Sequence, residues 1–110
     1  MKRLASLLAV SALVCTTACA YKGMYKQTNN SVNAAPVPAK DVNVAKSKDA
    51  VDKEWTEIGS YVGQAPTVAE AMDAAKVECG AHGANFYILN TDPFESEGVW
   101  KVDGICALTK

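Results

Sequence analysis

The side chains with the most distinctive chemistry in this 110-residue sequence are four cysteines: Cys15, Cys19, Cys79 and Cys106. A thiol can be acylated, oxidised to a disulfide or used as a metal ligand. The stretch 16–19 reads Thr-Thr-Ala-Cys and resembles the lipobox at which bacterial lipoprotein leaders are cut. This pattern predicts cleavage before Cys19 and lipid attachment to its sulfur. The alternative is ordinary small-x-small cleavage after Ala20, which would release a soluble protein that begins at Tyr21.

The residues before Cys19 have the composition of a secretory signal. Lys2 and Arg3 make a positive start, and Leu4–Val14 is an apolar run broken only by two serines. The run is shorter than the roughly 20 apolar residues that a spanning helix needs, so an uncleaved anchor is the less favoured reading. We expect residues 1–19 to be a lipoprotein signal peptide. Ala20 stands where many inner-membrane lipoproteins have aspartate, which favours the outer membrane, facing the periplasm.

Two cysteines remain once Cys15 leaves with the leader and Cys19 is acylated. Cys79 falls on the apolar stripe of a predicted helix, and Cys106 falls on the apolar face of a predicted strand. Both would point into the same layer of the fold. Export places them in an oxidising compartment, so we predict a disulfide between them. Two free thiols that serve as small core residues are the alternative.

Other chemistry-bearing residues show no arrangement typical of a catalytic or metal site. His82 is the only histidine and lies in the glycine-flanked stretch 80–83. Asp92, Glu95 and Glu97 lack the spacing and the central glycine of an EF-hand loop. We therefore expect no catalytic residue, no metal, no cofactor and no small-molecule substrate, and we do not expect an enzyme.

The elements that would position these residues form a strand-helix-strand-strand sequence. Residues 55–62 read as a strand with Ile58 and Val62 on one face. Thr67 and Glu70 are spaced as a helix-capping box, and Gly80 or Gly83 should end that helix. Residues 84–91 suit a central strand, and alternation from residue 100 to the end predicts a last strand that is irregular near Gly104. The fold class expected is α+β, with one helix packed on a small, mainly antiparallel sheet.

Charge and composition divide the chain after the leader. Residues 20–53 have few large apolar side chains and carry six lysines against three aspartates, a charge of +3. Residues 54–110 carry nine acids against three lysines, a charge of −6. We predict a flexible basic linker at 20–53 and a small α+β domain at 54–110. Such a linker could hold the domain well away from the lipid, and we expect no nucleic-acid partner for a domain this acidic.

Several short motifs resemble those of a known family. They are Glu57-Ile58-Gly59-Ser60, Gly83-Ala84-Asn85-Phe86-Tyr87-Ile88, Gly98-Val99-Trp100 and Gly104-Ile105-Cys106-Ala107-Leu108. The chain from about residue 54 resembles the YdgH/BhsA/McbA-like domain family, in its lipoprotein branch of BsmA-like biofilm peroxide resistance proteins. This resemblance implies a periplasmic or outer-membrane α+β module in envelope stress response or biofilm formation, without catalytic residues. Cys79 and Cys106 are not part of the usual family pattern.

A weaker resemblance is to RcsF-like outer-membrane lipoproteins. The lipobox, the expected tether, the stretch 83–85 and the strand with Cys106 are similar to theirs. This resemblance implies a disulfide-stapled domain that senses envelope damage and signals through protein partners. One disulfide is possible here, whereas the RcsF-like framework has two. A small soluble periplasmic protein or secreted enzyme is a third reading.

Overall fold

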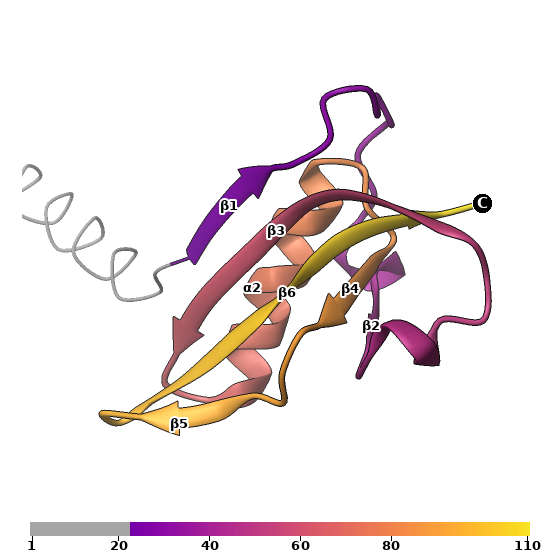
Figure 1. Cartoon of the computed structure of the whole chain (residues 1–110). Coiled ribbons are helices and arrows are strands. Elements are labelled where there is room, and N and C mark those ends of the chain that lie inside the picture. The colour runs from indigo at the N-terminus through magenta and orange to yellow at the C-terminus, as the bar shows by residue number, and fades with distance from the viewer. Residues whose placement is uncertain (1–22) are drawn as a thin grey trace, which may run out of the picture.

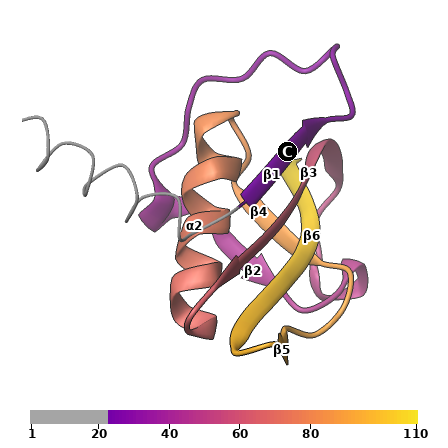
Figure 2. The ribbon, with the colours of Figure 1, turned by 90° about the vertical axis from the view of Figure 1, so that its left-hand side faces the viewer.

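The computed structural model describes residues 23–110. The predicted signal peptide at 1–19 and the predicted lipidation residue Cys19 lie outside the described residues. The described chain forms a sheet with an α-helix, α2, packed on one face (Figures 1 and 2). The strands are β1 Gly23–Gln27, β2 Asn43–Ala45, β3 Trp55–Ala65, β4 Phe86–Leu89, β5 Phe94–Ser96 and β6 Val99–Thr109. The helices are α2 Val68–Ala81 and two short 3-10 turns, η1 Ala39–Asp41 and η2 Lys48–Ala50.

The strand order is β1-β3-β6-β4-β2, and β5 pairs with β6 beside β4. All pairs are antiparallel except β2 with β4. This arrangement confirms the expected α+β class. β4 has β6 on one side and β2 on the other, so its place inside the sheet agrees with its run of apolar residues.

Helix α2 lies close to the sheet because its buried stripe consists of small residues. Ala71, Ala75, Cys79 and Gly80 are buried along it. The hydroxyl of Thr67 accepts a hydrogen bond from the Glu70 amide at 3.2 Å, which confirms the predicted cap. The helix ends at Ala81, and the left-handed residue that follows is Gly83, with φ +93°.

Strand β3 contains an irregularity that the sequence did not indicate. Its register with β6 shifts between Glu57 and Gly59, which leaves Ile58 as an extra residue. Beyond this bulge the alternation of faces is reversed, so Ile58 and Tyr61 are buried in the core beside α2 while Val62 points away from it. The expectation that Ile58 and Val62 share a face was therefore wrong. The irregularity expected near Gly104 is also absent, since β6 keeps a continuous register there.

Residues 23–53 do not form the flexible linker expected from their composition. They supply both edge strands of the sheet, and Val42, Ala45 and Val51 are buried. The segment between β1 and β2 crosses the end of α2, where the Val37 amide donates to the Gly80 carbonyl at 2.8 Å (Figure 2). Gly80 permits this approach, because a Cβ there would lie 2.2 Å from the Val37 carbonyl oxygen. The folded unit therefore begins near Gly23 instead of at residue 54.

The core has two parts, one on each face of the sheet. The larger part lies between α2 and the sheet and includes Ile58, Tyr61, Tyr87, Val102 and both buried cysteines. The smaller part lies on the opposite face, where Val51 from the β2–β3 connection covers Ile88 and Ile105. Residues from the expected linker thus contribute to both parts.

Candidate functional site

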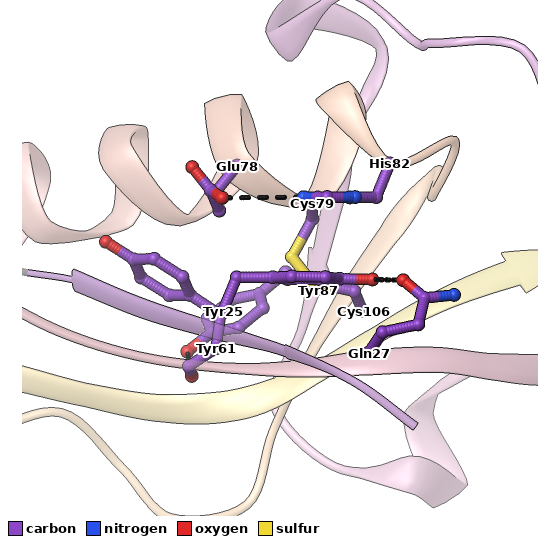
Figure 3. The surroundings of a disulfide bond; sticks show 8 residues. All are labelled: Tyr25, Gln27, Tyr61, Glu78, Cys79, His82, Tyr87 and Cys106. Carbon is purple, nitrogen blue, oxygen red and sulfur yellow. Dashed lines mark hydrogen bonds and ion pairs between the residues drawn. A yellow bond between two sulfur atoms is a disulfide. The ribbon is translucent and has the colours of Figure 1, made fainter. Parts of the chain in front are cut away.

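The predicted pair of cysteines is joined in the structure. A disulfide links Cys79 of α2 to Cys106 of β6, with a Cα–Cα separation of 5.2 Å (Figure 3). Both residues are fully buried. The bond connects the two layers of the fold across 27 residues of sequence. A bond so enclosed is poorly accessible to an attacking thiolate, which favours a structural over a redox-exchange role.

Two tyrosines pack beside the bridge on the same face of the sheet. The Tyr87 hydroxyl donates to the Tyr61 carbonyl oxygen at 2.9 Å, and the two rings meet edge to face with centroids 6.1 Å apart. Burial raises the pKa of both phenols, so both stay protonated at neutral pH. Glycines make room for the rings: a Cβ at Gly104 would lie 2.7 Å from the Tyr87 ring, and one at Gly63 would lie 2.5 Å from the Tyr61 hydroxyl.

The disulfide, the two tyrosines and a third group form one cluster. The third group is Tyr25, Glu78 and His82, which lies at the surface and joins β1 to the end of α2. The His82 ring stacks on the Tyr25 ring, with centroids 3.7 Å apart and planes 2° from parallel (Figure 3). His82 Nε2 lies 3.5 Å from Glu78 Oε1, one helical turn earlier. Partial burial, and then the Glu78 charge, raise the pKa of Tyr25. The trio holds an edge strand on the helix.

The sequence did not indicate a role for Tyr25, and it did not predict the contacts of His82 with Tyr25 and Glu78. Tyr25 lies in a five-residue edge strand within a stretch of polar composition, so its periodicity was too short to detect. The sequence placed His82 in a glycine-flanked stretch and gave it no partner. His82 caps the helix, and its side chain remains 39 % exposed even with its two partners.

The described residues place the other candidates apart from this cluster. Asp92 precedes β5, Glu95 lies in β5, and Glu97 with Gly98 forms the two-residue turn before β6. Both turn residues have positive φ, the pattern of a type I′ hairpin. Within residues 23–110 no three metal-ligating side chains converge. None of the helices in this range is both long and apolar enough to cross a bilayer.

Comparison with known proteins finds a solved structure whose fold is similar to that of this chain. No protein-family model matches the chain, and no curated protein sequence matches it. Among solved structures, the fold is similar to that of the Francisella virulence factor FvfA, with a TM-score of 0.55 and 13% sequence identity. The match covers 82% of this chain, about 90 residues, and 99% of that chain. It must therefore include residues before position 54, which agrees with a folded unit that begins near Gly23.

Proposed function

We propose that this protein is an exported envelope lipoprotein, anchored through Cys19, that acts by contacting other envelope proteins and not by catalysis. The observation that carries the proposal is the position of the lipobox relative to the fold. The motif ends at Cys19, four residues before Gly23, the first residue of β1. Cleavage before Cys19 would remove the leader, leave the folded unit whole and place the acylated residue directly before its first strand.

The disulfide supports export. A buried bridge between Cys79 and Cys106 persists in the oxidising cell envelope, whereas cytosolic thiols are kept reduced. A leader and a bridge that needs an oxidising compartment are two independent features with the same implication.

The contacts around the bridge support a non-catalytic role. The Tyr87 hydroxyl donates a hydrogen bond to backbone, and the His82 ring stacks on Tyr25 with its Nε2 3.5 Å from Glu78 Oε1. These side chains connect layers of the fold. The remaining surface is then available for protein contacts.

The resemblance to the YdgH/BhsA/McbA-like family suggests the process, namely envelope stress response or biofilm formation. The disulfide favours the second resemblance, to RcsF-like sensors, because a stapled domain is typical of those proteins and the cysteines fall outside the first family's pattern. The short connection from Cys19 to Gly23 differs from the long tether of such sensors. Both resemblances lead to a lipid-anchored protein that works through partners.

Labelling with a fatty acid in cells tests the anchor. The wild type and a Cys15→Ser control, altered within the leader, should both incorporate the label and sediment with membranes. Cys19→Ser should incorporate none. A wild-type protein that carries no label would contradict the proposal.

Crosslinking in cells tests the mode of action. Photoreactive residues at exposed positions, for example Val77 on α2, should give a discrete protein adduct whose yield changes when the envelope is damaged. Adduct-free protein at every exposed position would contradict a role through protein contacts. A defined adduct that appears only under envelope damage would favour the sensor over the general envelope component.

A further inference from the structure

The anchor and the start of the sheet are close together along the chain, which restricts where the lipid can lie. Gly23 is four positions after Cys19, and four residue steps span at most about 14 Å when fully extended. The expected 34-residue linker would have allowed far greater separation, but residues 23–53 of it are part of the fold. An acylated Cys19 therefore keeps the beginning of β1 within about 14 Å of the bilayer surface.

The elements at that end of the molecule follow from the strand register. Gly23 pairs with Gly63 near the end of β3, and Gln64 pairs with Lys101 at the start of β6. Lys101 in turn pairs with Phe94 of β5. The start of β1, the end of β3 and the β5–β6 hairpin thus share one end of the molecule (Figure 1).

Most of the large exposed apolar side chains of the described residues gather at this end. Met24 is 74% exposed, Val62 is 50% exposed and Phe94 is 49% exposed. Met24 and Val62 are direct cross-strand partners. Val68, at the first residue of α2, is also exposed at this end, whereas Val77 lies further along the helix.

Met24, Val62 and Phe94 also lie on the same face of the sheet. Val62 follows the buried Tyr61 in β3, and Lys101 precedes the buried Val102 in β6, so both point away from α2. Directly paired residues share a face, which puts Met24 beside Val62 and Phe94 beside Lys101. Three apolar side chains thus stand on the sheet face opposite the helix, within three strand spacings of about 4.8 Å each.

Lysines accompany these apolar residues. Lys26 occupies the same face of β1 as Met24, two residues further on. Lys101 is the direct partner of Phe94, and its strand β6 lies between the strands of Val62 and Phe94. Asp103 is the acid on this part of the face, and it accepts a hydrogen bond from Asn90. Apolar groups mixed with lysines fit a lipid headgroup region, since a lysine can bury its methylenes while its ammonium contacts phosphate.

We propose that this anchor-side patch, made of Met24, Val62 and Phe94 with Lys26 and Lys101, rests on the lipid headgroups. The inference depends on the proposed acylation of Cys19. A lipid surface is the occupant because the anchor delivers this end of the fold to the bilayer, within the reach of four residues. The face covered by α2, and with it His82, is then turned away from the lipid and toward partners.

Fluorescence quenching in reconstituted vesicles tests the patch. The acylated full-length protein is placed in vesicles of phosphatidylethanolamine and phosphatidylglycerol with brominated acyl chains. Phe94→Trp and Met24→Trp report on the patch, Val77→Trp is the matched exposed control on α2, and the wild-type signal is subtracted. Patch tryptophans should be quenched at least about twice as strongly as the control, because interfacial apolar groups are buried about 5–10 Å. Circular dichroism checks that each variant is folded.

The outcomes separate this inference from the anchor itself. Protein that is acylated and vesicle-bound, but with equal quenching at Phe94→Trp and Val77→Trp, would overturn the patch and leave the anchor intact. Protein without acylation would overturn both. Quenching that is weak at the patch while crosslinked dimers form through it would assign the surface to a second copy and overturn the lipid assignment.

Discussion

Breaking the Cys79–Cys106 disulfide should remove most of the stability of the domain. The bond closes a loop between residues 27 apart, and the chain-entropy model assigns about 3.6 kcal/mol at 25 °C to a loop of that size. Domains of fewer than 100 residues often have a total free energy of unfolding of only about 5 kcal/mol. The reduced protein should therefore be marginally folded.

Urea unfolding with and without reductant measures this effect. Tryptophan fluorescence is suitable because Trp55 starts β3 and Trp100 lies in β6. With a slope of about 1 kcal/mol/M, reduction should lower the urea midpoint by roughly 3.6 M. A double Cys79→Ala, Cys106→Ala variant is the control, since it should unfold early and be insensitive to reductant. A midpoint shift below about 0.5 M in the wild type would refute the view that the bond is the main staple.

Three further perturbations test the packing around the bridge. Gly104→Ala should cost about 1–3 kcal/mol, because its Cβ would lie 2.6 Å from the Ile88 carbonyl oxygen, and thermal unfolding at wild-type temperature would contradict this close contact. The contribution of Tyr87 to the stability should be constant below about pH 10 and fall as pH rises further, because the buried phenol stays protonated where an unfolded one ionises. Urea midpoints across that range should fall less steeply for Tyr87→Phe, and equal slopes would count against this assignment. His82→Ala should lower the free energy of unfolding by about 0.5–1.5 kcal/mol and speed amide hydrogen exchange in β1, because the stack on Tyr25 is lost. The control Val77→Ala should leave exchange in β1 unchanged. Unaltered exchange in β1 of the His82→Ala variant would show that the stack does not hold the strand.

The sequence predicted the elements whose signals are local. Thr67 and Glu70 predicted the helix start, and the apolar stripe that contains Cys79 predicted its buried side. The disulfide followed from the periodicities of one helix and one strand. Each of these signals is contained within about a dozen consecutive residues.

The parts that the sequence did not predict depend on contacts between distant residues. β1 and β2 are short edge strands of five and three residues, and their composition is that of a linker. They are ordered by pairing with β3 and β4, and by the passage of Val37 over Gly80. The bulge at Ile58 likewise has no turn residue pattern of its own, since it is set by pairing with β6. The stack of Tyr25 on His82 depends on β1 and was hidden for the same reason.

The intact mass of the protein extracted from membranes in detergent is the most direct test of lipid anchoring. We expect a chain that begins at Cys19 and carries the additional mass of acyl groups. A chain that begins at Tyr21 without acyl mass, or one that retains the leader, would contradict the anchor.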